Sequence, residues 1–141
     1  MRDKPRGGVL RRRSAMLAIE LLFVLPVLLI VVLATVEFSL WLSAQQQVAL
    51  ASREGARVAA QGGSADDVQQ TVQLVLGPNW SSAAQVAASL NDSDGNPLPA
   101  GAPVSVLVTL PAGTVVPDLL VLAGFSIGNE IIASQTVMRK E

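Results

Sequence analysis

Carboxylates are the first side chains to consider for chemistry in this sequence, because it contains no histidine and no cysteine. Without them the chain lacks the commonest general base, the thiol nucleophile and the usual zinc ligands. Asp92 and Asp94 flank a turn, but the remaining ligand spacing of an EF-hand calcium loop is missing. No phosphate-binding loop or GxGxxG motif is present. Four further acids have no spacing that groups them for hydrolysis: Asp66, Asp67, Asp118 and Glu130. We therefore expect no enzyme, no metal site and no cofactor.

Two other carboxylates, Glu20 and Glu37, lie in or beside a long apolar run. From Leu21 to Val36 no side chain is charged. A bilayer core about 30 Å thick is crossed by roughly 20 helical residues. In hydrocarbon the backbone must satisfy its own hydrogen bonds, which only a helix does within one segment. The sequence therefore predicts a single transmembrane helix over residues 16–42.

The surroundings of the two carboxylates give them different expected roles. Glu20 lies just inside the inner boundary of the run, where an ionised group usually has a partner. Either it reaches the inner headgroups or a leader arginine, or it pairs with a neighbouring chain, and physical grounds alone favour neither. Glu37 lies one turn before Trp41, whose ring suits the outer membrane interface. We expect Glu37 to reach outward to headgroups, and a subunit contact on the helix face is the alternative.

The charges on the two sides of the run predict its orientation. Residues 1–15 form a basic leader with six Lys or Arg side chains against Asp3 alone, whereas the acids prevail after residue 42. Basic residues beside a membrane segment stay in the cytoplasm. We expect a single-pass protein of the bacterial inner membrane, with the N-terminus in the cytoplasm and the C-terminal part outside. A nucleic-acid-binding tail and a cleaved signal peptide ending near Ala44 are the less favoured alternatives.

The helix is expected to continue beyond the membrane, from residue 43 to residue 61. Small and apolar side chains recur there at helical spacing: Ala44, Val48, Ala51, Gly55 and Ala59. Such a stripe lets another element approach closely. The opposite face carries Arg53, Glu54 and Arg57, for which a solvated face is favoured over a subunit contact. Pro26 should kink the membrane half, and Gly62-Gly63 should end the helix.

Residues 62–141 predict a small extracytoplasmic domain. Ser64 is a candidate cap for a second helix that ends at Gly77-Pro78. Three segments alternate as half-buried antiparallel strands do: Gln85 to Asn91, Val104 to Leu110 and Ile131 to Arg139. The fold class is therefore α+β, with a long transmembrane helix continuing into a domain in which a second helix packs on a sheet of about three strands.

Val115 to Phe125 is apolar but too short to span a bilayer. We favour a core element covering the sheet, with an exposed patch for a partner or the membrane as the alternative.

The pattern of the first 60 residues resembles type IV pilin-like proteins, and more narrowly the TadE-like family of tight-adherence (Flp) pilus assembly proteins. The resemblance rests on Ser14-Ala15, Glu20, Leu25-Pro26, Glu37 and the phrase Ala51 to Arg57, ASREGAR. It implies a pilin-like fold and cleavage by a prepilin peptidase between Ala15 and Met16. Glu20 would then be fifth in the mature chain. The residue before the cut is usually glycine in this class, and here it is Ala15.

The resemblance implies a minor pilin or pseudopilin of a tight-adherence pilus or a related secretion system. Its partners would be the bilayer, other pilin subunits, the prepilin peptidase and the assembly platform, and not nucleic acid. In that role Glu20 could neutralise the amine of Met16 on an adjoining subunit. The competing hypotheses are a membrane-anchored binding or sensor module with an uncleaved leader, or an uncleaved inner-membrane component of the platform.

Overall fold

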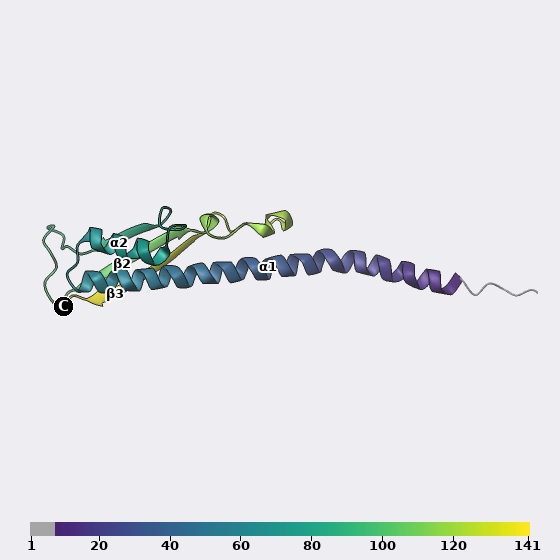
Figure 1. Cartoon of the computed structure of the whole chain (residues 1–141), viewed down its shortest axis with the longest axis horizontal. Helices are drawn as coiled ribbons and strands as arrows, with labels where there is room; N and C mark the ends of the chain where they lie inside the picture. The colour runs from purple at the N-terminus through teal and green to yellow at the C-terminus, as the bar shows by residue number, and fades with distance from the viewer. Residues whose placement is uncertain (1–7) are drawn as a thin grey trace, which may run out of the picture.

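The computed structural model describes residues 8–141, which form one long helix with a small domain beside its C-terminal half (Figure 1). The helices are α1 (Gly8–Ala60) and α2 (Ala65–Leu76), and the strands are β1 (Gln85–Ser89), β2 (Pro103–Pro111) and β3 (Ile131–Arg139). Two short 3-10 turns, η1 (Ala112–Thr114) and η2 (Leu119–Ala123), lie between β2 and β3. The predicted α+β layout is confirmed.

Helix α1 is one unbroken element of 53 residues, about 80 Å long at 1.5 Å per residue. It begins at Gly8 and not near residue 16, so it includes residues 8–15 of the leader; residues 1–7 lie outside the described part. No proline follows Pro5 until Pro26, so nothing in the leader stops the helix from extending backward. Pro26 lies inside α1 without ending it. Ala60 ends α1 one residue earlier than expected, and Gly62 follows with a positive φ of 84°.

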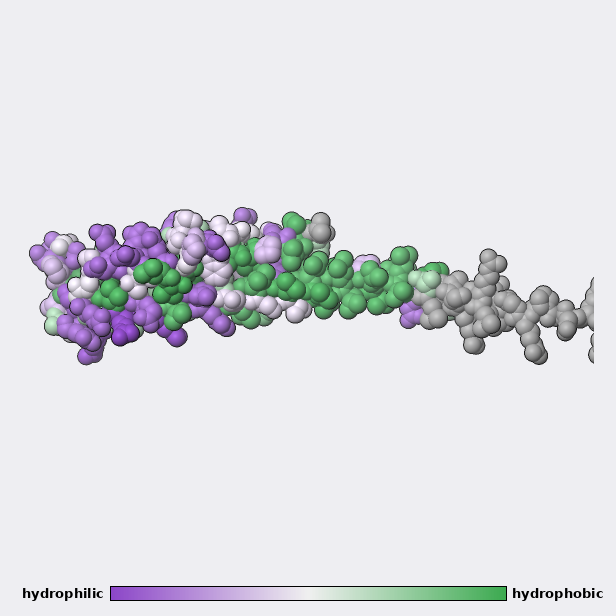
Figure 2. All heavy atoms as spheres, in the orientation of Figure 1, coloured by the Kyte–Doolittle hydropathy of each residue, from purple (hydrophilic) through white to green (hydrophobic). Residues whose placement is uncertain are grey.

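Between Leu21 and Val32, α1 carries apolar side chains on all sides, and Figure 2 shows the bare part of the helix as a largely green rod. Within the described residues, α1 holds the one stretch that is long and apolar enough to cross a membrane. No element among the described residues covers the side chains between Leu21 and Val32, which are exposed. A helix that is apolar on all sides is normally buried in a protein core or in a membrane. The bare part of α1 is therefore suited to being covered by lipid or by the same helix of other subunits.

Helix α2 begins at a reciprocal cap. The Ser64 hydroxyl accepts a hydrogen bond from the Asp67 backbone N–H (3.2 Å), and the Asp67 carboxylate accepts one from the Ser64 N–H (2.9 Å). The Ser64 hydroxyl also donates to the same carboxylate. The predicted cap is confirmed, and Gly77 ends the helix as expected. The buried stripe of α2 is Val68, Val72 and Leu76.

The three strands form one antiparallel sheet in the order β1-β2-β3. Pairs such as Val106 with Thr136 fix the register of β2 against β3. Alternate residues of β2 are fully buried and the others are half-buried, which confirms the period-two prediction. The predicted turn between β1 and β2 is also present, since the Asp92 carboxylate accepts from the N–H groups of Asp94 and Asn96.

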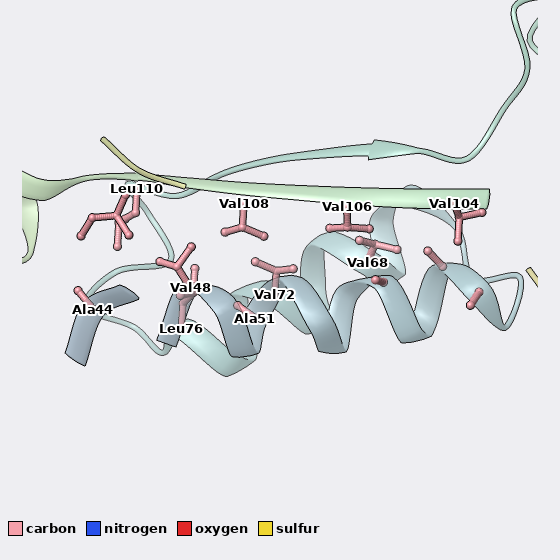
Figure 3. Close-up of a cluster of buried hydrophobic side chains, with 14 of the residues drawn as sticks. Ala44, Val48, Ala51, Val68, Val72, Leu76, Val104, Val106, Val108 and Leu110 are labelled. Carbon is pink, nitrogen blue, oxygen red and sulfur yellow. The ribbon is translucent and has the colours of Figure 1, made fainter. Parts of the chain in front are cut away.

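The core lies between one face of the sheet and the two helices (Figure 3). The small-residue stripe of α1 is its floor: Ala44, Val48 and Ala51 are completely buried. Val104, Val106, Val108 and Leu110 of β2 point toward this floor, and Val68 and Val72 of α2 fill the side. One half of the helix is thus exposed and apolar, and the other half packs against the domain.

Removing the α2 cap should destabilise the domain in a pH-dependent way. The hydrogen bonds from Ser64, first from its hydroxyl and then from its N–H, lower the pKa of Asp67 below its ordinary value. Because the pKa of Asp67 is lower in the folded state than in the unfolded state, the ionised carboxylate stabilises the fold at pH values above its unfolded-state pKa. This stabilisation is lost as the pH falls through the folded-state pKa. Ser64→Ala should lower the free energy of unfolding by about 1 kcal/mol at neutral pH. Urea unfolding at pH 7 and near pH 3 should show a larger deficit at pH 7; equal deficits would contradict the linkage.

Candidate functional site

The residues singled out in the sequence all lie on α1, spread along its length. The expected cleavage point between Ala15 and Met16 falls inside the helix, and the Met16 side chain is 75% exposed. Glu20 follows one turn later and is also exposed. Four residues on a helix rise about 6 Å. The cleavage point and the carboxylate therefore lie close together on a bare segment of the rod.

Glu20 has no covering element around it in the described part of the chain. Its neighbours Ile19, Leu21 and Leu22 are all exposed. None of these neighbouring side chains can pair with a carboxylate. An ionic partner for Glu20 must therefore come from outside the described side chains. The geometry therefore fits both alternatives that the sequence leaves open, a contact with the inner headgroups or a leader arginine and an ion pair with a neighbouring chain.

Glu37, unlike Glu20, is buried, because another segment of the chain covers it. Its side chain is 2% exposed, and one oxygen, Oε2, accepts a hydrogen bond from the Leu120 backbone N–H at 3.0 Å. The other oxygen, Oε1, is buried without a hydrogen-bond partner among the described residues. The expectation that Glu37 reaches outward to headgroups is therefore wrong, as is its use as a subunit contact. Segment η2 folds over it.

A small cavity of about 240 Å³ lies beside Glu37. Apolar side chains of α1 form one wall, and Leu120 and Ile127 from the segment around η2 form the other. Phe38 and Trp41 stack there with ring centroids 6.3 Å apart. One carboxylate is thus enclosed by apolar groups at the place where the exposed half of α1 meets the domain.

The segment from Val115 to Phe125 does not cover the sheet, as the favoured expectation had it. Val116 is buried, but η2 lies against α1 beyond the end of the sheet (Figure 1). Asp118 precedes η2, and Gly124 ends it in the left-handed region. The Asp118 side chain does not cap η2, because its carboxylate accepts from the Ser126 hydroxyl instead.

The comparisons with known proteins single out the same helix. Residues 16–57 match the family model described as TadE-like protein. Over this segment the chain is TadE-like. The match begins at Met16, the first residue after the expected cut, and it ends three residues before α1 does. No curated protein and no solved structure matches the chain.

The TadE-like segment comprises the bare half of α1 and its extramembrane continuation, and not the sheet. The resemblance seen in the sequence is confirmed for it, and it associates the chain with the Tad pilus. Inside the segment, Gly55 is buried, and the nearest side chains are those of Val68, Val72 and Val106. The glycine of the ASREGAR phrase thus marks the closest approach of α2 and β2 to α1.

The charged residues of the same phrase lie on the other side of the TadE-like helix. Arg53 and Arg57 are exposed, and Arg57 lies 3.8 Å from the Glu54 carboxylate in an exposed i,i+3 pair. Such pairs contribute little to stability. Their positions are those of a solvated face, and no described element contacts them as a partner would.

One buried polar group of the TadE-like segment was missed by sequence reasoning. Ser52 is completely buried, and its hydroxyl lies 3.0 Å from that of Ser134 and 2.8 Å from that of Thr136, both on β3. The three hydroxyls join α1 to the edge strand. The signal was available, because Ser134 and Thr136 interrupt the otherwise apolar inward face of β3 between Ile132 and Met138.

Proposed function

We propose that the chain is a minor pilin or pseudopilin of a tight-adherence (Flp-type) pilus or a related secretion system, with a part in pilus assembly and surface adhesion. The observation that carries this proposal is the exposed carboxylate of Glu20 on a bare apolar helix whose TadE-like segment begins at Met16. A helix uncovered on every side is suited to lipid before assembly and to like helices afterwards. The role requires no catalysis by this chain.

In the proposed mechanism, a prepilin peptidase hydrolyses the bond between Ala15 and Met16. The cut leaves a free amine on Met16, about one turn from Glu20. Glu20 of one subunit then accepts the ammonium group of a neighbouring subunit. An unpaired carboxylate surrounded by apolar groups is costly, and pairing with an ammonium group offsets much of that cost. The pair therefore acts as a register mark that favours one stagger between adjacent helices.

The proposed placement is the bacterial inner membrane, with the leader in the cytoplasm and the α+β domain outside. The support is the charge asymmetry, because the leader carries Arg11, Arg12 and Arg13 directly before the apolar run. From this position the partners are the bilayer, other pilin or pseudopilin subunits, the peptidase and the assembly platform. No role with nucleic acid is proposed.

The mature N-terminus tests the proposal most directly. Mass spectrometry of the chain isolated from its native membrane should find a chain that begins at Met16. A chain that begins near Ala44 would indicate a secreted protein and contradict the pilin proposal. An intact leader would instead favour a membrane-anchored binding or sensor module, or an uncleaved platform component.

The register role of Glu20 has a separate test. Glu20→Ala should lower incorporation into filaments at least ten-fold while the amount in the membrane stays unchanged, because the neighbouring ammonium loses its partner. Immunoblots of sheared filaments and of membranes give the two amounts. Glu54→Ala, on the same helix but outside the span, is the matched control and should incorporate normally. Normal incorporation of Glu20→Ala would refute the pairing.

A further inference from the structure

The projecting end of the domain, defined here as residues 119–127 and called the η2 tip, exposes apolar side chains. Val121 is 55% exposed and Phe125 is 68% exposed. The η2 tip extends past the sheet and runs beside α1 (Figure 1). In Figure 2 the green surface of the bare helix continues onto this projecting end. The exposed apolar side chains of the η2 tip therefore lie next to the exposed apolar surface of α1.

Contacts with α1 fix the height of the η2 tip along the helix. The Leu120 N–H is bonded to Glu37 at 3.0 Å, and Leu120 and Ile127 line one cavity together with Ala34 and Trp41. The η2 tip therefore lies at the level of helix residues 34–41. The rest of the domain, in contrast, packs on α1 from Ala44 onward.

That level coincides with the end of the membrane span. If the hydrocarbon begins at Glu20, a core of about 30 Å ends roughly 20 residues later, near Leu40. If it begins directly after Arg13, it ends near Leu33, and the next roughly 5–8 Å of α1, to about residue 38, cross the headgroup layer. The η2 tip then lies at the outer edge of the hydrocarbon or in the headgroup layer, whichever boundary applies.

The charge of this region agrees with such a position. Between Ala112 and Asn129 the sequence has one charged residue, Asp118. One Asp118 oxygen accepts from the Ser126 hydroxyl and the other is buried. The carboxylate is thus turned into the tip, while the apolar side chains of Val121 and Phe125 face outward. Interfacial membrane segments show this arrangement.

We propose that the η2 tip is a second membrane contact, in which Val121 and Phe125 insert into the leaflet nearest the domain. The occupant of this surface is the lipid bilayer, because the exposed side chains of the tip lie beside the exposed apolar surface of α1 and at the level where its apolar run ends. Glu37 is a positioning residue that holds the tip against α1 through the Leu120 N–H. Two contacts, one through α1 and one through the η2 tip, fix how the domain stands on the membrane. The inference rests on α1 spanning the membrane and not on the chain being a pilin.

Fluorescent labels can test this in the full-length chain reconstituted in phosphatidylcholine vesicles. The chain has no cysteine, so Val121→Cys and Val137→Cys each give one labelling site. The two valines are matched, being 55% and 60% exposed, but Val137 lies near the far end of β3. With an NBD label, nitroxide groups on the lipid acyl chains should quench residue 121 at least three-fold more than residue 137. Iodide in the buffer should show the reverse preference.

Two additional variants keep the outcome interpretable. A label at Leu29→Cys reports on the span itself and should be quenched by the nitroxide lipids, so failure of the helix and failure of the η2 tip are distinguishable. Glu37→Leu removes the acceptor of the Leu120 N–H, whereas Glu37→Gln retains an oxygen there. The preference of residue 121 for nitroxide lipid should fall at least two-fold in the leucine variant and persist in the glutamine variant. Equal values in both would refute the positioning role of Glu37.

Three results would overturn the membrane contact. Quenching of residue 121 by iodide to the same extent as residue 137 would place the tip in water. Protection from both quenchers that increases with the protein-to-lipid ratio would identify a second copy of the chain as the occupant. Protection from both at every ratio would mean that the tip is buried within its own domain.

Discussion

Gly55→Leu is expected to destabilise the extramembrane domain by about 3 kcal/mol or more, at the upper end of what overpacked cores lose. Helix α1, helix α2 and strand β2 meet at Gly55. A Cβ atom placed there would lie 2.9 Å from a Val72 methyl carbon and 3.3 Å from one of Val106. Leucine adds three further carbons to that Cβ, and the surrounding valines are buried and cannot withdraw. The loss is a large part of the stability of a domain of this size.

Urea unfolding of the full-length chain in non-ionic detergent, followed by the fluorescence of its tryptophans, measures the effect of Gly55→Leu. Gly55→Ala should change stability far less, because the gain in helix propensity of about 1 kcal/mol offsets much of the cost of the two close contacts. Gln46→Leu, on the exposed side of the same helix, is the matched control and should stay within about 0.5 kcal/mol of the wild type. A leucine variant as stable as this control would show that α1 and α2 do not pack as closely as described.

The parts of the fold that follow a local period could be predicted from the sequence. The alternation of valines in β2 fixed its inward face, and the small-residue stripe of α1 identified the side on which the domain packs. Ser64 and Gly77 marked the ends of α2 because caps and positive-φ positions depend on single residues. These signals are read within a few residues of each other, so no knowledge of distant neighbours is required.

The contacts that could not be predicted join residues far apart in the sequence. Glu37 and Leu120 are 83 positions apart, and nothing near Glu37 indicates that a backbone N–H from η2 will reach it. The apolar character of Val115 to Phe125 was recognised, but an apolar segment packs equally well on a sheet or a helix by composition alone. The start of α1 was also misplaced, since helix extension into the leader depends on the neighbouring apolar run and not on the leader's own composition.

For the candidate residues too, local signals could be read from the sequence, whereas contacts with distant residues could not. Sequence reasoning placed Glu20 correctly as a carboxylate at the edge of the apolar run, since the run itself defines its surroundings. It placed Arg53 and Arg57 on a solvated face, which helical spacing alone decides. Glu37 has a similar neighbourhood in the sequence to that of Glu20, yet it is buried and Glu20 is exposed. The difference comes entirely from η2.

The double variant Leu28→Lys/Leu29→Lys is expected to release the chain from the membrane. Both side chains are more than half exposed on the bare part of α1, and they lie near the middle of the run. Lysine at the centre of a spanning helix costs roughly 2.5–3.5 kcal/mol, so two cost roughly 5–7 kcal/mol. The Leu, Ile, Phe and Val residues between Leu21 and Leu40 contribute roughly −5 to −9 kcal/mol in total on the same scale. Two lysines therefore remove most or all of the driving force for insertion.

Alkaline extraction of membranes measures the effect, with the wild-type chain retained and the double-lysine chain mostly released or degraded. Leu28→Ala/Leu29→Ala keeps the positions uncharged and should remain in the membrane. Gln45→Lys/Gln46→Lys places the same two charges on an exposed face of the extramembrane continuation and should also be retained. This second control separates the position of the charge from its sign and number. If the double-lysine chain resisted extraction as well as the alanine control, α1 would not cross the membrane at Leu21 to Leu40, and the level assigned to the η2 tip would be wrong with it.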